Sequence, residues 1–114
     1  MSPGCIFCRI AAKEIPSTIV YEDGEVVAFR DASPQAPTHV LVIPKRHVAS
    51  LDDAGDAEAT LLAAMMLVAK KVAAGAGLAR GYRVVTNCGP EAGQSVAHLH
   101  LHVLGGRPMT WPPG

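Results

Sequence analysis

The sequence lacks an excess of charge of either sign, and it has no apolar run long enough to span a membrane. Ten Lys and Arg residues balance ten Asp and Glu residues among 114 positions, so the net charge at pH 7 is zero. A protein that binds nucleic-acid polymers or anionic membranes usually presents a strong positive field, so we expect neither partner. The longest mainly apolar run, Ala59–Ala69, is about half the length of a transmembrane helix.

Cysteine is also scarce, with three residues in the chain. An odd number argues against a framework of disulfides, and the N-terminus lacks the basic start and apolar stretch of a secretory signal. We therefore expect a cytoplasmic protein whose cysteines are thiols or metal ligands.

The composition is that of a globular protein. Hydrophobic residues make up 49% of the chain and charged residues 18%, which excludes an intrinsically disordered protein. The length suits one compact core, so we expect residues 1–114 to form a single domain.

Short segments rich in Val, Ile, Tyr and Phe predict strands. Glu22-Asp23-Gly24 separates two of these segments and predicts a hairpin turn. Short connections favour antiparallel pairing over a parallel arrangement. The predicted strands are Ser17–Tyr21, Glu25–Arg30, His39–Ile43, Tyr82–Thr86 and His98–Leu104.

Two segments predict helices. Ile6–Ala12 is short, and Pro16 follows it closely, so it forms one or two turns. Ala57–Ala74 has apolar residues at helical spacing over a face wider than one small sheet needs. That face suits a buried core helix and a helix at a subunit interface equally well. The fold class is therefore α+β, with a five-stranded antiparallel sheet, a short N-terminal helix and a long helix.

The segment His98-Leu99-His100-Leu101-His102-Val103-Leu104 alternates histidine with apolar residues. On a strand, its apolar side chains would enter the core, and its three imidazoles would share the other face about 6.6 Å apart. Folding alone explains such a row poorly, because protonated rings repel one another below about pH 6.5. The row predicts a functional site.

Two kinds of chemistry fit three histidines in a row. They could bind one catalytic Zn²⁺, or one imidazole could be a nucleophile while its neighbours donate hydrogen bonds to an anion. The preceding loop, Asn87–Ser95, offers an amide, a hydroxyl and backbone N–H groups, which suit phosphate oxygens better than a metal. The sequence has no P-loop motif and no nearby carboxylate pair for Mg²⁺.

These motifs resemble the histidine triad family, in particular its Hint-like branch. The triad segment matches the family motif, in which three histidines alternate with apolar residues. Four other segments are similar to the family in the same order, namely Asp31–His39, Leu41–His47, Ala92–Ser95 and Leu104–Gly114. The resemblance runs from about Ile6 to Gly114.

The resemblance implies a hydrolase similar to adenosine 5′-monophosphoramidase. Such an enzyme attacks the α-phosphorus of a nucleoside phosphoramidate, forms a nucleotidyl-histidine and releases a nucleoside monophosphate. His100 matches the nucleophile, and His102, His98 and His39 match the residues that complete the catalytic group. The implied chemistry needs no catalytic cofactor. Two alternatives are a metal-dependent hydrolase that uses the triad as zinc ligands and a nucleotide-binding regulatory module with little turnover.

The resemblance also implies a site for a purine nucleotide of the AMP type. Asp31 matches a carboxylate that binds both ribose hydroxyls, and Gly93, Gln94 and Ser95 match the turn that holds the phosphate. Phe7 and Phe29 suit the base site and an ordinary core equally well. The implied nucleotide-binding residues are Ile6, Phe7, Ile10, Phe29, Asp31, Ala32, Asn87, Gly93, Gln94, Ser95, His100, His102 and Trp111.

Cys5-x-x-Cys8 is a weak motif by itself and is compatible with zinc, redox chemistry or chance. The resemblance implies a structural zinc site formed by Cys5, Cys8, His47 and His98, a closed Cys₂His₂ set. His98 therefore has two implied roles, one at the metal and one in catalysis.

The resemblance finally implies a homodimer with a continuous ten-stranded sheet. The long helix and a strand would meet their copies across a two-fold axis, and the C-terminal tail with Trp111 would reach toward the neighbouring site.

Overall fold

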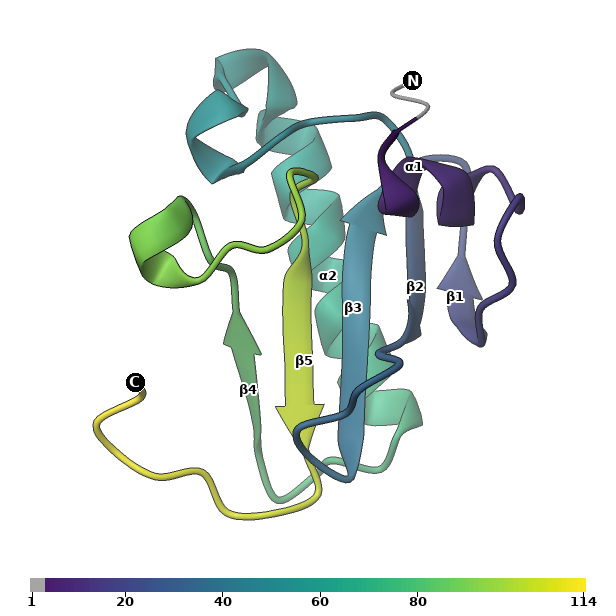
Figure 1. Ribbon diagram of the computed structural model, residues 1–114. Helices are drawn as coiled ribbons and strands as arrows, with labels where there is room; N and C mark the ends of the chain where they lie inside the picture. The colour runs from purple at the N-terminus through teal and green to yellow at the C-terminus, as the bar shows by residue number, and fades with distance from the viewer. Residues whose placement is uncertain (1–3) are drawn as a thin grey trace.

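A five-stranded antiparallel sheet, with the order β1-β2-β3-β5-β4, forms the centre of the molecule (Figure 1). This computed structural model describes residues 4–114. The short helix α1 and the long helix α2 complete the fold, which confirms the predicted class. The elements are α1 (Ile6–Ala11), β1 (Ile19–Glu22), β2 (Val26–Arg30), β3 (Thr38–Pro44), α2 (Ala59–Gly75), β4 (Tyr82–Val85) and β5 (Leu101–Gly105).

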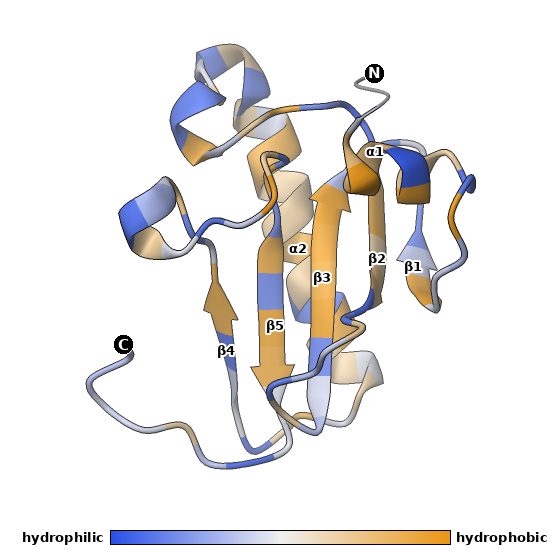
Figure 2. Cartoon of the chain, in the orientation of Figure 1, coloured by the Kyte–Doolittle hydropathy of each residue, from blue (hydrophilic) through white to orange (hydrophobic). Residues whose placement is uncertain are grey.

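The central strand β3 is covered on both faces. Val40 and Val42 belong to the apolar cluster beneath α2, whereas Leu41 and Ile43 belong to a second cluster on the opposite face. Because alternate side chains of a strand point to opposite faces, a strand buried on both sides must be apolar almost throughout. Figure 2 shows β3 as a nearly continuous hydrophobic band.

Helix α2 covers one face of the sheet with part of its apolar surface. Leu61, Met65 and Val68 are buried against the sheet, as their helical spacing predicts. Met66 and Leu67 point away from it and are 52% and 57% exposed. Most of the wide apolar face is therefore buried, Ala69 and Ala73 included, while Met66 and Leu67 are in contact with solvent.

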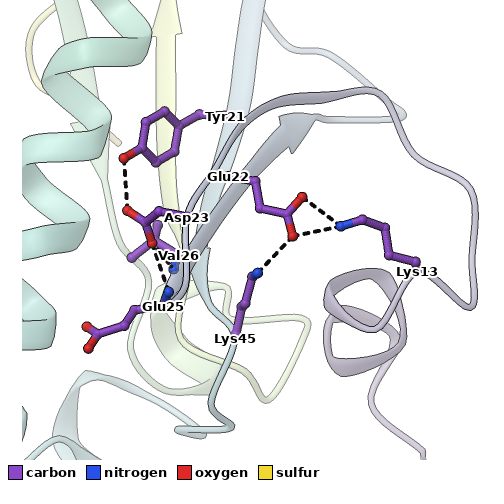
Figure 3. A network of polar contacts seen from close by, with 7 residues as sticks. All are labelled: Lys13, Tyr21, Glu22, Asp23, Glu25, Val26 and Lys45. Atoms are coloured by element: carbon purple, nitrogen blue, oxygen red, sulfur yellow. Dashed lines mark hydrogen bonds and ion pairs between the residues drawn. The ribbon is translucent and has the colours of Figure 1, made fainter.

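Helix α1 lies on the opposite face, where Phe7 and Ile10 join Leu41 and Ile43 in the second cluster. An ion-pair network fixes the end of this helix to the sheet (Figure 3). The Lys13 ammonium lies 2.6 Å from one carboxylate oxygen of Glu22, and the Lys45 ammonium lies 2.8 Å from the other. These two lysines lower the pKa of the Glu22 carboxyl, Lys13 more strongly than Lys45.

The predicted hairpin between β1 and β2 is present, and an aspartate organises its turn. The carboxylate of Asp23 accepts hydrogen bonds from the N–H groups of Glu25 and Val26, at 2.8 and 2.9 Å (Figure 3). Aspartate favours turns because its short side chain can bond the backbone two or three residues onward.

The prediction that His98–Leu104 forms one strand is wrong in its first half. Strand β5 begins at Leu101, so His102 is in the ladder and His98 and His100 precede it. The register of β3 and β5 would place Leu99 opposite Pro44, which has no N–H to continue the ladder. The N–H of Leu99 instead donates to the carbonyl of Val48 at 2.6 Å.

Within residues 4–114, no helix combines the length and the apolar character that a membrane crossing requires.

Candidate functional site

The sheet face that carries α1 also carries two histidines from neighbouring strands. His39 pairs with Leu104 and His102 pairs with Leu41 across the β3–β5 ladder, so the two histidines are diagonal neighbours on one face. Nε2 of His39 lies 2.9 Å from Nδ1 of His102. The sheet register thus joins two residues that are 63 positions apart in the sequence.

The proton between these two rings can be assigned from a backbone group. The N–H of Gln35 donates to Nδ1 of His39 at 3.0 Å, so this nitrogen carries a lone pair. The proton of neutral His39 is then on Nε2, which faces Nδ1 of His102. Oδ2 of Asp31 lies 3.4 Å from the same Nε2 and favours a proton there. Since Nδ1 of His102 accepts, its own proton is on Nε2.

That proton on His102 has no hydrogen-bond partner in the part of the chain that the structure describes. Among residues 4–114, Nε2 of His102 is the buried side-chain nitrogen that lacks a hydrogen bond. Buried polar groups are nearly always bonded, so an unpartnered N–H marks a place where a ligand acceptor fits. Burial, followed by the neighbouring His100 and His39, lowers the pKa of His102 to about 4, so the ring is neutral near pH 7.

The ring of His100 lies beside that of His102, with 5.0 Å between their centroids. Nδ1 of His100 lies 2.7 Å from the carbonyl oxygen of His98, so Nδ1 carries the proton and Nε2 carries the lone pair. The hydroxyl of Thr86 donates to the carbonyl of His100 at 2.9 Å, and the Phe7 ring meets the imidazole edge-on at 5.1 Å. His100 therefore presents a nucleophilic nitrogen in a fixed orientation.

His98 points in a different direction, toward Cys5 and Cys8 at the start of α1. Its Nδ1 lies 3.3 Å from Sγ of Cys5 and 3.5 Å from Sγ of Cys8, and Nδ1 of His47 lies 3.2 Å from Sγ of Cys8. All four donor atoms lie within 4.8 Å of one another. Cys5 is the N-cap of α1, and Cys8 lies one helical turn further on, so both thiols face the same side.

This cluster fits a tetrahedral Zn²⁺. Ligands at about 2.0 to 2.3 Å from zinc are separated by roughly 3.5 Å, which is close to the observed sulfur–nitrogen distances. Nε2 of His98 lies 2.8 Å from the carbonyl oxygen of Pro44, so it carries the proton and leaves Nδ1 free to bind metal. The four residues are the set that the family resemblance implied. The three triad rings, in contrast, do not form the predicted row on one face, because His98 faces the cysteines while His100 lies beside His102.

A second group of potential ligands, formed by Asp31, His39 and His102, does not fit a metal ion. A histidine that binds metal through one nitrogen carries its proton on the other and donates it to an acceptor. Nδ1 of His39 instead faces the N–H of Gln35, so Nε2 must hold the proton and cannot bind metal. The geometry therefore disfavours a metal ion at this group, and none of the donor clusters found among residues 4–114 joins the three triad histidines that the alternative of a catalytic zinc requires.

The predicted phosphate loop is organised by Gln94. Its side-chain oxygen accepts from the N–H of Gly89, and its amide nitrogen donates to the carbonyls of Ala49 and Val96 at 2.8 and 3.0 Å. The backbone N–H groups of Gly93 and Gln94 close the turn onto the carbonyls of Pro90 and Gly89. Gln94 thus shapes the loop, whereas Ser95 is exposed.

The other predicted nucleotide-binding residues differ in exposure. Phe7, Ile10 and Phe29 are at most 7% exposed and form part of the second apolar cluster. Ile6 is 47% exposed. Ala32 is also exposed, while Asp31 and Asn87 are partly buried. The aromatic residues are therefore core, and Ile6 and Ala32 offer surface to a ligand.

Trp111 does not join the other candidates within one chain. Its side chain is 82% exposed. Figure 1 shows the C-terminal tail leaving the end of β5 and running outward past β4. The tail is tied to the sheet by Arg83, which donates to the carbonyl of Thr110 at 2.9 Å.

Sequence reasoning missed the backbone groups that orient the rings. Gln35 and Pro44 act through an N–H and a carbonyl, which carry no signature in residue type. Pro44 could have indicated where β5 begins, because a residue without an N–H interrupts the hydrogen-bond ladder in the middle of a sheet.

The histidine pair predicts an acid-sensitive fold. Burial lowers the pKa of His39, against the effect of Asp31, and the pKa of His102 lies near 4. Between about pH 6.5 and 4 the unfolded chain therefore binds protons that the folded chain does not, so the free energy of unfolding falls as pH falls. We expect His102 to contribute about 1 to 2 kcal/mol of this loss between pH 7 and 5, allowing for its partial exposure.

Urea unfolding at both pH values measures this loss, with His102→Asn as the neutral control. The Asn variant should lose less stability on acidification than the native chain. An equal loss in both proteins would contradict the assignment.

Comparison with known proteins finds relatives along almost the whole chain. The HIT domain matches residues 12–109. The 14 kDa zinc-binding protein of Zea mays is 55% identical over 111 residues, which cover 96% of this chain and 87% of that protein.

Solved structures agree with the fold. A crystal structure of a HIT family hydrolase from Legionella pneumophila has a TM-score of 0.96 and 54% identity, and the match covers 97% of this chain and 100% of that chain. A histidine triad nucleotide-binding protein from Candida albicans has a TM-score of 0.82 and 35% identity, over 96% of this chain and 83% of that chain.

Proposed function

The chain belongs to the HIT domain family, and from this membership we propose that it is a nucleotide-binding hydrolase that cleaves nucleoside 5′-phosphoramidates at the α-phosphorus. One observation carries the proposal. The carbonyl of His98 holds the proton of His100 on Nδ1, which leaves Nε2 as a nucleophile beside the unpartnered N–H of His102.

The first step is attack of Nε2 of His100 on the α-phosphorus. The new N–P bond forms as the bond between phosphorus and the departing amine breaks, and the amine takes a proton from solvent. The ring becomes a nucleotidyl imidazolium, whose positive charge is shared with the Nδ1–H bonded to the carbonyl of His98. In the second step, water attacks phosphorus as the N–P bond breaks, and the attacking water loses a proton to solvent. A nucleoside monophosphate and neutral His100, with its proton still on Nδ1, are released.

His102 supplies electrostatic stabilisation in both steps. Its Nε2–H can donate to a non-bridging phosphate oxygen as negative charge develops there, in a site that is partly shielded from water. The exposed hydroxyl of Ser95 and the partly buried amide of Asn87 would complete the contacts to phosphate.

The nucleotide site would take a purine ribonucleotide of the AMP type. One oxygen of Asp31 accepts from the N–H of Ser33 at 2.8 Å, and the other lies near His39, so the carboxylate is held in place for the ribose hydroxyls. Ile6 and Ala32 would contact the base. An apolar contact of this kind discriminates poorly among bases. The relative from Candida albicans is named as nucleotide-binding.

Cys5, Cys8, His47 and His98 would hold a structural zinc. When bound, the ion would link α1 to the segments that carry the two histidines, and it takes no part in the chemical steps. A reducing cytoplasmic compartment would keep both cysteines as thiols, which lose their protons when they bind zinc. The maize relative is named as zinc-binding.

We also propose that the protein is a homodimer. The exposed Met66 and Leu67 on α2 and the half-exposed Tyr82 on the edge strand β4 offer surface for a second copy. In that arrangement the C-terminal tail with Trp111 would lie near the neighbouring site. Sedimentation equilibrium that gives the mass of one 11.9 kDa chain would reject the dimer.

Rapid-quench reaction with adenosine 5′-phosphoramidate tests the function. We expect a covalent AMP adduct on the protein in the first turnover, with equal yield before and after removal of metal under conditions in which the chain stays folded. Intact protein-mass spectrometry measures the adduct. Loss of the reaction on chelation by a folded chain would favour a metal-dependent hydrolase, whereas tight binding with no cleavage would favour a regulatory nucleotide-binding module.

A further inference from the structure

We infer that the peptide N–H of Gln35 is a positioning group, which makes His102 a neutral hydrogen-bond donor rather than a source of protons. The catalytic meaning of this inference depends on the proposed hydrolysis. The assignment of the protons does not, because it follows from the contacts of three groups alone: the N–H of Gln35 and the rings of His39 and His102.

The N–H of Gln35 sets the direction of the two hydrogen bonds that join Gln35, His39 and His102 in series. A side-chain amide or hydroxyl can donate or accept, but a backbone N–H can only donate. The N–H of Gln35 points at Nδ1 of His39 at 3.0 Å, so a proton on this nitrogen would face another proton. His39 is therefore neutral with its proton on Nε2, and it cannot change to the other tautomer without losing this bond.

The same constraint passes to the next ring. Nε2–H of His39 faces Nδ1 of His102 at 2.9 Å, so Nδ1 of His102 must accept. A cationic His102 would carry protons on both nitrogens, and one of them would meet the proton of His39. The ring is held in the neutral form that has its N–H on Nε2, the atom that lacks a partner within residues 4–114.

A neutral imidazole that gives up its only proton would become an anion, unless a proton replaced it at Nδ1. His39 could supply that proton only by becoming an anion itself, because the N–H of Gln35 occupies its other nitrogen. His102 therefore donates a hydrogen bond to the phosphate and keeps its proton. The departing amine must take its proton from solvent.

The loop that carries Gln35 is held on both sides. The guanidinium of Arg107 donates to the carbonyl of Gln35 at 3.0 Å, a contact that does not use the Gln35 side chain. Gly106 lies against Pro37, so closely that a Cβ atom at Gly106 would meet the proline ring at 2.8 Å. These contacts fix the loop that presents the N–H to His39.

The sharpest experiment replaces one atom of the backbone. Lactic acid incorporated at position 35 changes the peptide N–H to an ester oxygen, and Gln35→Ala is the matched control, because the two proteins differ only in that group. Nitrogen-15 NMR of the imidazole rings reads the tautomers directly. We expect Gln35→Ala to keep the native pattern, with protonated Nε2 in both His39 and His102, and the ester protein to show both tautomers of His39.

The same pair of proteins tests the consequence for catalysis. In the ester protein, the rate of adduct formation should fall roughly tenfold or more, with little change in nucleotide affinity, because part of the population lacks the donor at Nε2 of His102. Gln35→Ala should react at close to the native rate. A purely structural role would lower the rate in both proteins, and that result would overturn the proposal.

The spectrum of the native protein is decisive even where the ester protein does not fold. A proton on Nδ1 of His39, or a cationic His102 at pH 7, would overturn the inference. If the protein binds nucleotides but does not cleave phosphoramidates, the proposed function fails, while the native tautomer pattern still decides whether Gln35 sets the protons.

Discussion

Replacing His100 by alanine should abolish the nucleotidyl adduct and lower turnover by on the order of 10⁴-fold or more. The structure gives His100 the lone pair at Nε2, because its other nitrogen is bonded to the carbonyl of His98. No other histidine near it is arranged in the same way. His102 presents an N–H, and the ring of His98 has one nitrogen on the carbonyl of Pro44 and the other near the cysteines.

His102→Ala is the informative comparison for this experiment. It removes a donor rather than the nucleophile, so the adduct should still form, at a rate about 10² to 10³-fold lower. Both variants should bind a nucleoside monophosphate within a few-fold of the native affinity, as measured by calorimetry. An adduct of undiminished yield in His100→Ala would move the nucleophile to another residue.

Cys8→Ser should remove the metal and a large part of the stability. Cys8 is fully buried, and its sulfur contacts both His47 and His98. Structural zinc contributes directly to the free energy of folding. We expect the zinc content to fall from about one ion per chain to near zero, and the free energy of unfolding to fall by about 3 kcal/mol or more, which is about 10 °C or more in melting temperature.

Cys88→Ser is the matched control, since Cys88 lies outside the four-residue cluster. It should keep its zinc and change stability by less than about 1 kcal/mol. Elemental analysis and thermal unfolding measure both quantities. Native protein that is free of metal, and a Cys8→Ser variant of native stability, would together contradict the zinc site.

The fold could be predicted from the sequence because the spacing of apolar residues clearly distinguishes its strands from its helices. The strand segments are short, β-branched and separated by turn residues, and α2 has apolar residues at helical spacing. Hydrophobic pattern therefore specified the order and type of the elements. It could not specify where β5 begins, because that depends on which partner lies opposite and on Pro44 in another strand.

The sequence names histidines that the structure brings together, but it does not give the directions of their rings. A motif names His98, His100 and His102 without stating which nitrogen of each ring is protonated. The structure sets those protons with the carbonyls of Pro44 and His98 and the N–H of Gln35. Such groups occur in every residue, so only the path of the chain shows which of them face a ring.

The missing N–H of Pro44 bears on attempts to transplant the site. A designer who grafted the seven motif residues onto an uninterrupted strand of another scaffold would obtain imidazoles that all project alike, none of them steadied by a neighbouring carbonyl. In this protein the hydrogen-bond ladder between β3 and β5 ends early, because the N–H of Leu99 donates to the carbonyl of Val48 instead. His98 and His100 therefore lie outside the regular strand, where they can take different directions. A working graft would have to carry that interruption with it.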